Sequence, residues 1–310
     1  MDLIFCGTPA FAVPTLERLV ASGFDVKLVV TQPDRPSGRG MAVAAPPVKQ
    51  AALRHGLAVT QPERIKNNLE FRTLLESLRP SAIVVVGYGR IIPGWMLALP
   101  PRGNINLHAS LLPRYRGAAP VQWAIASGDT MTGVSTMLID AGLDTGPVLR
   151  QLEAPIHDDD TSLTLWPRLA ELGAGLLVET LLELETGSIT GTPQEPALAT
   201  LAPILKKEDG RIDFSRRADE ICNRLRGFQP WPGAYTTFRE NQLAFTRARP
   251  AETAATAAPG EILLEGGRLF AGCGGGSAVE VREVHPAGKR RMTAAQFISG
   301  YHPRSGEAFG

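Results

Sequence analysis

The hydrophobic pattern of the first two thirds of the chain alternates between short apolar runs and segments with helical spacing. Apolar positions at helical spacing predict helices after the Gly7-Thr8-Pro9 turn through Ala21, over Val48 to His55 and over Thr161 to Leu184. Pro167 and Gly173 are expected to interrupt the last of these. Strands alternating with helices predict an α/β domain with a Rossmann-like, mostly parallel sheet. The predicted strands are Leu3 to Cys6, Val26 to Thr31, Ala82 to Val86, Ile105 to Leu107 and Val134 to Ile139.

The last third of the chain has a different pattern. A stretch rich in Thr, Pro, Gly and Ala is followed by a helical segment from Ala218 to Phe228 and then by short β-like runs between Gly and Pro turns. This pattern predicts a small OB-like β-barrel. We therefore expect one domain over residues 1–189, a linker over 190–205 and a C-terminal domain over 206–310. The β-like runs are Ala234 to Phe238, Leu243 to Arg247, Glu261 to Leu264 and Ala278 to Val284.

Length and charge are compatible with two domains, one of which is mildly basic. A chain of 310 residues with 44% hydrophobic content can bury two cores. The formal net charge is only +1, but residues 206–310 hold 16 Lys and Arg against 12 Asp and Glu, which leaves 16 against 19 for residues 1–205. This division permits contact with a polyanion without requiring it.

Several protein classes are disfavoured by the sequence. Cys6, Cys222 and Cys273 are too few for a disulfide framework and lack zinc-ligand spacing, and the other histidines lack paired ligand spacing, so we expect no metal. No signal peptide or membrane-spanning run is evident, which predicts a cytoplasmic protein without a membrane partner. Gly7-Thr8-Pro9 has one glycine where a dinucleotide fold needs three, and no P-loop motif follows.

The candidate chemistry lies at the end of the fourth predicted strand. Alternation along a strand directs Asn106 and His108 to the same side, and Asp144 follows 36 residues later in a glycine-rich turn. An amide can donate to a developing oxyanion, an imidazole can transfer a proton, and a carboxylate can orient that imidazole. These groups are suited to acyl transfer. A purely structural role, with Asn106 and His108 as hydrogen-bonded polar groups and Asp144 as a turn residue, is the alternative.

Two loops surround this candidate site. The segment from Ser110 to Pro120 is neither amphipathic nor alternating, and its two prolines and one glycine predict a shaped loop. Neither Ser110 nor any cysteine occupies a strand-to-helix elbow, so direct transfer is favoured over a covalent enzyme intermediate. The Pro- and Gly-rich stretch from Gln32 to Gly40 cannot be helical. It is either a solvated loop or an adaptable segment whose arginines contact phosphates or base edges.

These residues resemble a known family. Asn106-x-His108, the Ser110 to Pro120 loop and Asp144 in its Gly-Leu-Asp-Thr-Gly setting are similar to those of the 10-formyltetrahydrofolate-dependent formyltransferases. The resemblance implies that an amine attacks the formyl carbon, that Asn106 and His108 stabilise the oxyanion, and that Asp144 anchors His108. His108, Asp144 and water all remain candidate proton acceptors. It also implies that the folate lies against Ser110, Leu111, Leu112, Pro113, Gly87, Tyr88 and Ile92.

The remaining motifs resemble the branch of this family that formylates methionine on initiator tRNA. Arg39 matches the key basic residue of that branch's tRNA-contacting loop, and Leu205 to Phe214, Asn223 to Pro232 and Pro286 to Lys289 match its second domain. The resemblance implies that residues 1–189 are catalytic and that 206–310 bind tRNA. The implied tRNA contacts are Arg35, Arg39, Lys206 and Lys207. Met41 to Ala45 is apolar where such loops often carry further basic residues.

The full expectation is a monomeric enzyme with 10-formyltetrahydrofolate and initiator methionyl-tRNA as substrates. An amino-sugar formyltransferase is the alternative within the same chemistry, and the arginine-bearing loop argues against it. A tRNA-binding module with an inactive site is the alternative from another class, and a purely structural α/β protein explains least.

Overall fold

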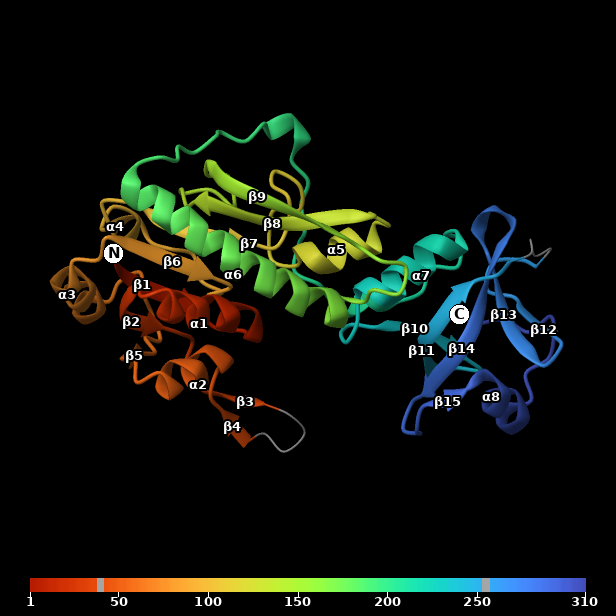
Figure 1. The fold of residues 1–310 in the computed structure, drawn as a ribbon. Helices are drawn as coiled ribbons and strands as arrows, with labels where there is room; N and C mark the ends of the chain where they lie inside the picture. Colours follow the sequence, from red (N-terminus) through yellow and green to blue (C-terminus); the bar gives the residue numbers. More distant parts are fainter. Residues whose placement is uncertain (38–41, 253–256) are drawn as a thin grey trace. The chain divides into compact units, whose positions relative to one another are not determined.

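The computed structural model of the protein describes residues 1–37, 42–252 and 257–310 (Figure 1). Its contacts divide the chain into two compact units. Unit 1 comprises Met1–Pro120, Met131–Pro155 and Trp166–Ala202, and unit 2 comprises Val121–Thr130, Ile156–Leu165 and Pro203–Gly310.

Unit 1 is built on a seven-stranded sheet with the order β5-β2-β1-β6-β7-β8-β9. The first five strands in this order, β5-β2-β1-β6-β7, pair in parallel. The pairs β7 with β8 and β8 with β9 are antiparallel. The expectation of a mostly parallel sheet is therefore confirmed. The strands are β1 (Asp2–Gly7), β2 (Asp25–Val30), β5 (Val59–Thr60), β6 (Ala82–Val86), β7 (Asn104–His108), β8 (Met131–Leu138) and β9 (Val148–Pro155).

Helices join the strands of this sheet, as Figure 1 shows. One buried apolar cluster combines strand residues such as Ile4 and Val85 with Phe71 and Leu75 of α3 and Met96 of α4, so these two helices cover one face. A short hairpin, β3 (Arg35–Ser37) with β4 (Ala42–Ala44), precedes α2. The helices of this part of the chain are α1 (Val13–Ala21), α2 (Pro47–Arg54), α3 (Leu69–Leu78), α4 (Gly94–Leu97), α5 (Pro120–Ala126) and α6 (Ser162–Thr186).

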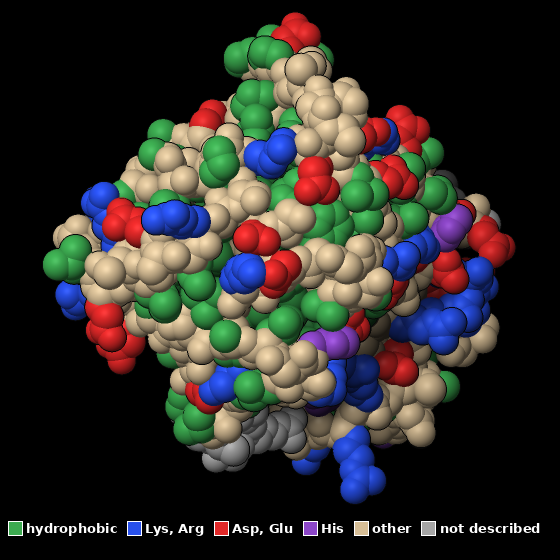
Figure 2. Space-filling model, turned by 60° about the vertical axis from the view of Figure 1, so that its left-hand side comes forward, with side chains coloured by type: hydrophobic (Ala, Val, Ile, Leu, Met, Phe, Trp, Pro, Cys, Tyr) green, Lys and Arg blue, Asp and Glu red, His purple; other side chains and the backbone are tan. Residues whose placement is uncertain are grey.

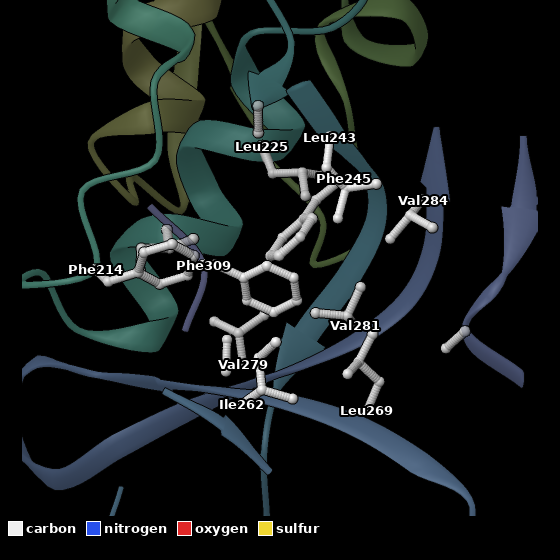
Figure 3. Close-up of a cluster of buried hydrophobic side chains, with 14 of the residues drawn as sticks. Phe214, Leu225, Leu243, Phe245, Ile262, Leu269, Val279, Val281, Val284 and Phe309 are labelled. Carbon is white, nitrogen blue, oxygen red and sulfur yellow. The ribbon is translucent and has the colours of Figure 1, made fainter. Parts of the chain in front are cut away.

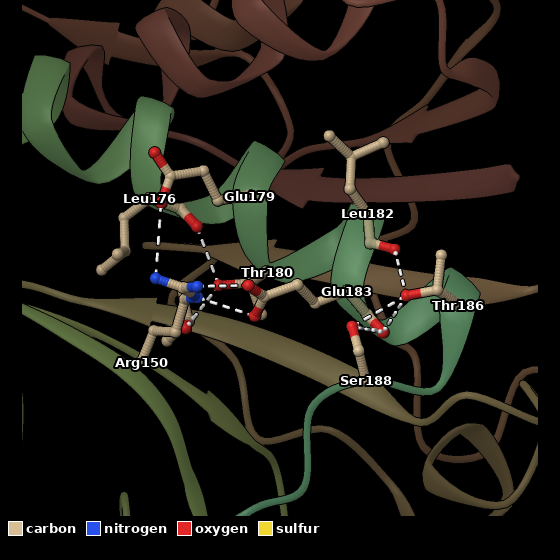
Figure 4. Close-up of polar contacts among 9 residues, drawn as sticks. Arg150, Leu176, Glu179, Thr180, Leu182, Glu183, Thr186 and Ser188 are labelled. Atoms are coloured by element: carbon tan, nitrogen blue, oxygen red, sulfur yellow. Dashed lines mark hydrogen bonds and ion pairs between the residues drawn. The ribbon is translucent and has the colours of Figure 1, made fainter.

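Helix α6 runs without interruption through Pro167 and Gly173, so the predicted break there is wrong. Pro167 cannot donate to the carbonyl of Leu163, a residue whose side chain is exposed to solvent. A side chain at Gly173 would lie 2.7 Å from Leu107, so the glycine lets α6 pack closely on β7. Later in the helix, Glu183 forms a bidentate ion pair with Arg150 of β9 (Figure 4). These contacts stabilise α6 despite the low helix propensity of Pro167 and Gly173.

Unit 2 contains an antiparallel sheet with the order β10-β11-β14-β13-β12, in which β15 also pairs with β14. Figure 3 shows its core, where Leu225 of α7, Phe245 of β11 and Val281 of β14 point toward one another. A C-terminal antiparallel β domain is thus confirmed. Its elements are α7 (Ala218–Gly227), β10 (Ala234–Phe238), β11 (Asn241–Pro250), β12 (Ile262–Glu265), β13 (Arg268–Cys273), β14 (Ser277–Pro286), β15 (Met292–Thr293) and α8 (Ala294–Tyr301).

A buried carboxylate organises three arginines on this sheet. Glu280 of β14 is only 3% exposed. Its oxygens accept hydrogen bonds from Arg268 at 2.7 and 3.0 Å and from Arg249 at 2.7 Å, and Arg282 lies at 3.0 Å. These guanidinium groups, Arg268 foremost, lower the pKa of Glu280 to about 2.

We expect Glu280→Gln to destabilise unit 2 in a pH-dependent way. The pKa of Glu280 is lower in the folded than in the unfolded chain, so the carboxylate stabilises the fold above its unfolded pKa of about 4.5, and the stabilisation disappears toward pH 2. At pH 7 the loss should be on the order of 2 to 3 kcal/mol, because the arginines are partly exposed and screened. Amide hydrogen exchange in β14 measures it. A difference that does not shrink between about pH 4.5 and 2 would contradict the assignment.

Charges of both signs are mixed over the surface that Figure 2 shows. Lys and Arg side chains lie among Asp and Glu there, and hydrophobic side chains are spread between them. Within the described ranges, no helix is long and apolar enough to cross a membrane.

Candidate functional site

Asn106 and His108 lie on β7, near the carboxyl ends of the parallel strands. Val85 of β6 pairs with Asn106 in register, so Asn106 and His108 face the side of the sheet that α3 and α4 cover. Leu107 points the opposite way, against α6. Asn106 is partly exposed, and its side chain makes no hydrogen bond within the described ranges. The amide is therefore available to a ligand.

The protonated nitrogen of neutral His108 can be identified from its contacts. The ring is 6% exposed, and its Nε2 atom lies 2.9 Å from the carbonyl oxygen of Tyr115. A carbonyl can only accept a hydrogen bond, so Nε2 carries the hydrogen. The other nitrogen, Nδ1, lies 3.7 Å from the Asp144 carboxylate. In the neutral ring Nδ1 is therefore the unprotonated nitrogen, and a proton taken up there faces a negative charge.

Asp144 is held in the turn between β8 and β9. Its φ of 51° is in the left-handed region, which Asp tolerates better than most residues. The Oδ2 atom accepts a hydrogen bond from the Gly117 amide at 2.8 Å, and this oxygen is the one that faces His108. Earlier in the turn, Asp140 Oδ1 accepts hydrogen bonds from Gly142 N and Thr145 Oγ1. The turn thus brings Asp144 beside His108, which shares its face of β7 with Asn106.

The Ser110 to Pro120 loop is anchored to β8 and β9 by polar contacts. Ser110 is fully buried, and its hydroxyl donates to the Arg114 carbonyl at 2.6 Å. The Leu112 amide donates to Ser135 Oγ, and the Leu112 carbonyl accepts from Gln151. The side chain of Leu112 is buried, whereas Leu111 and Pro113 are partly exposed. Of the four loop residues predicted to bind folate, Leu111 and Pro113 are the ones that solvent reaches.

In the loop after β6, the predicted folate contacts Tyr88 and Ile92 are buried, and a neighbouring apolar residue is exposed. The side chains of Tyr88 and Ile92 belong to the buried cluster that α3 and α4 form with the sheet, and burial raises the pKa of the Tyr88 hydroxyl. The Tyr88 carbonyl accepts hydrogen bonds from Thr8 and Gln32, both at 3.1 Å. Ile91, in contrast, is 90% exposed. The surface available to a ligand here is formed by Gly87, Gly89 and Ile91.

A groove of about 770 Å³ lies beside this loop. It is lined by the turn after β1, by the β3–β4 hairpin with the residues on either side of it, and by residues 87–89. Its position at the carboxyl ends of β1 and β6 is where open α/β sheets bind ligands. Most of its lining is apolar, and Thr8, Gln32 and Arg35 supply polar groups.

The basic residues predicted to contact tRNA are on the surface where the structure describes them. Arg35 is exposed on β3 and lines the groove. Lys206 and Lys207 are exposed at the start of a short 3₁₀ helix, Lys207–Gly210. Arg39 and Met41 lie outside the described residues.

Comparison with known proteins identifies the family. The model described as "Formyl transferase" matches residues 1–181, and the one described as "Formyl transferase, C-terminal domain" matches residues 204–302. The methionyl-tRNA formyltransferase of Koribacter versatilis is 62% identical over 310 residues, which cover all of this chain and 99% of that protein. The chain belongs to the methionyl-tRNA formyltransferase family. Another relative of the same name, from Solibacter usitatus, is 52% identical over 312 residues, 100% of this chain and 99% of that one.

Solved structures share the fold of this family member at low identity. A sugar 3N-formyltransferase, WlaRD, solved with dTDP and 5-N-formyl-THF, has a TM-score of 0.67 at 16% identity and is matched over 94% of this chain and 99% of its own. The N-formyltransferase of Helicobacter canadensis, solved with folinic acid and dTDP-3-aminofucose, has a TM-score of 0.65 at 17% identity, over 90% and 98%. These likenesses concern the fold alone.

Sequence patterns did not indicate three features of this site. The Tyr115 carbonyl, which determines the His108 tautomer, is a backbone group and carries no sequence signal. Ile91 is distinguished from Ile92 only by burial. Gln194, whose side chain contacts the Asp144 turn, lies 50 residues from Asp144 in a segment without periodicity.

Among the described residues, no three His, Cys, Asp or Glu side chains form a group that could hold a metal ion.

Proposed function

We propose that this protein transfers the formyl group of 10-formyltetrahydrofolate to the α-amino group of methionine on initiator tRNA. Family membership supports the reaction type and the substrates. One geometric observation carries the assignment of the site. Asn106, whose amide makes no hydrogen bond to a described residue, and His108, whose Nδ1 faces Asp144, lie on the same side of β7.

Asn106 would stabilise the oxyanion that forms on the formyl oxygen. The amine attacks the formyl carbon, so negative charge develops on that oxygen as the new N–C bond forms. The Asn106 amide can donate a hydrogen bond to it from a fixed strand. In the second step the bond between the formyl carbon and N10 of the folate breaks, which releases the formylated amine. No covalent bond to the enzyme is needed.

His108 Nδ1 would carry the proton between the two nitrogens. The attacking amine must lose one proton, and N10 must gain one. Nδ1 is the unprotonated nitrogen of the neutral ring, so it can accept the first proton directly or through water and return it to N10. While protonated, the ring would be stabilised by the Asp144 carboxylate at 3.7 Å, and its positive charge would favour the oxyanion. Asp144 would thus orient His108 without accepting the proton.

The folate would lie along the Ser110 to Pro113 segment and the loop after β6. We assign contacts to Leu111, Pro113 and Gly87, whose surfaces solvent reaches, and we add Ile91 as an apolar contact. The other implied folate contacts are buried and would shape the backbone around the ligand. They are Ser110, Leu112, Tyr88 and Ile92.

The tRNA would contact both units through exposed basic residues. Arg35 lines the groove beside the site. Arg39, which lies outside the described residues, stays a proposed contact on the family resemblance of its sequence. Lys206 and Lys207 would approach phosphates from the 206–310 domain, which carries 16 basic against 12 acidic residues.

We further propose that residues 1–189 form the catalytic domain, that 190–205 connect it to the tRNA-binding domain, and that the protein acts in the cytoplasm as a monomer. Three buried free thiols are consistent with a reducing compartment.

A substrate comparison tests this proposal. The full chain is incubated with 10-formyltetrahydrofolate and with methionyl initiator tRNA, free methionine or a dTDP-amino sugar, and the formylated products are measured. We expect formylation of the charged tRNA and little of the other two amines. Formylation of the amino sugar instead would contradict the proposed substrate. Tight binding of charged tRNA with no turnover would identify a binding module.

A further inference from the structure

Residues 191–202, which we name the strap, pack on the rest of unit 1 at two places. Thr192 and Val148 exchange two backbone hydrogen bonds of 2.8 Å. Farther along, Arg116 N donates to the Thr200 carbonyl at 2.8 Å, and Ala202 N donates to the Arg116 carbonyl at 2.7 Å. The strap is therefore fixed to the start of β9 and to the Ser110 to Pro120 loop.

Gln194 lies between these two anchor points and uses its whole hydrogen-bonding capacity. Its Nε2 atom donates to the carbonyl oxygens of Asp144 at 2.8 Å and Gly146 at 2.7 Å. Its Oε1 atom accepts from Arg116 Nε at 3.0 Å and from Nη2 at 2.7 Å. Carbonyls only accept and a guanidinium only donates, so the orientation of this amide is unambiguous. One side chain thus joins the Asp144 turn to the Arg116 loop.

The two segments joined by Gln194 both contribute to the position of the Asp144 carboxylate. The left-handed backbone of Asp144 is held from one side by the bond to its carbonyl. From the other side, the Gly117 amide, one residue beyond Arg116, donates to Oδ2 at 2.8 Å. If the turn and the loop moved apart, Oδ2 would lose this donor and its distance from His108 would change.

We propose that Gln194 is a positioning residue for catalysis, which fixes Asp144 relative to His108. The proposal rests on the function proposed above, because it assigns Asp144 a role in that reaction. Gln194 does not contact the reacting groups in this scheme. Its effect should therefore appear in kcat and depend on an intact Asp144.

Two variants remove the hydrogen bonds of Gln194 in whole or in part. Gln194→Met keeps the length of the side chain and loses all four hydrogen bonds. Gln194→Glu can still accept from Arg116, but it sets a carboxylate against two carbonyl oxygens. Glu195→Ala is the matched control, because Glu195 is its exposed neighbour in the strap. Thermal unfolding shows whether each variant is folded.

Single-turnover formylation of methionyl initiator tRNA is the measurement. We expect both Gln194 variants to lose about tenfold to hundredfold in rate, since a misplacement of about 1 Å can cost that much. The KM values for both substrates and the rate of Glu195→Ala should stay within about threefold of the wild type. In an Asp144→Asn background, Gln194→Met should cost no more than about threefold further.

The outcomes separate this proposal from the proposed function. A Gln194→Met rate within about twofold of the wild type beside a slow Asp144→Asn would overturn the positioning role alone. Losses that multiply in the double variant would also overturn it, because they would show that Gln194 acts independently of Asp144. A fully active Asp144→Asn would refute the role of Asp144 in the proposed function itself.

Discussion

Replacing His108 with alanine should lower kcat by about 10² to 10⁴-fold, the usual contribution of a positioned acid–base group. The ring is nearly buried, its Nε2 hydrogen is used by the Tyr115 carbonyl, and Nδ1 is the site left for a transferred proton. Without the imidazole, the attacking amine must lose its proton to bulk water, and the oxyanion loses a positive charge beside it. The rate of a single turnover with saturating substrates measures this loss directly.

Two further variants separate chemistry from structure at His108. His108→Gln retains a donor for the Tyr115 carbonyl but cannot take up a proton, so it should be as slow as the alanine variant and unfold closer to the wild-type temperature. His285→Gln is a matched control, since His285 Nε2 likewise lies 2.8 Å from a backbone carbonyl, that of Lys289, and His285 is not among the residues assigned to the reaction. Near-normal turnover in His108→Gln would exclude proton transfer by this residue.

The sheet of unit 1 could be predicted because its strands carry their information locally. Ala82–Val86 is a continuous β-branched and apolar run, as a parallel strand buried on both faces requires, and the predicted bounds match the observed ones. β9 (Val148–Pro155) was not predicted. Few of its positions are buried, and it is held by pairing with β8 and by the ion pair of Arg150, neither of which leaves a local pattern.

The candidate site, like the sheet of unit 1, could be predicted only where the information is local in the sequence. The shared direction of Asn106 and His108 follows from the two-residue period of a strand and needs no tertiary information. The approach of Asp144 to His108 depends on a turn held by Gly117 and Gln194, which are 27 and 50 residues away in the chain. Such contacts are set by packing between segments that are distant in the chain, and they leave no local pattern. From its composition, the segment around Gln194 could therefore be predicted only to be a linker.

Asn106→Ala should lower kcat by about 10² to 10³-fold and leave stability nearly unchanged, because its amide is partly exposed and is assigned to the oxyanion. Asn104, two residues earlier on the same face of β7, should behave in the opposite way. Its amide is buried and donates to the carbonyls of Met96 and Leu97 at 3.0 and 3.2 Å. Asn104→Ala should therefore cost about 1 to 3 kcal/mol of stability, with kcat within about threefold of the wild type.

The pair of variants tests the oxyanion assignment more sharply than either alone. Both replace an asparagine on one strand and one face, so a general weakening of β7 would lower kcat and stability together in both. Chemical unfolding and single-turnover rates, measured on the same preparations, distinguish the two effects. If Asn106→Ala unfolds as readily as Asn104→Ala and loses no more rate than it does, the Asn106 amide has a structural role and the oxyanion must be stabilised elsewhere. A large rate loss confined to Asn106→Ala would leave transition-state stabilisation as its cause, because the ground-state fold and the strand that carries the residue would be shown intact.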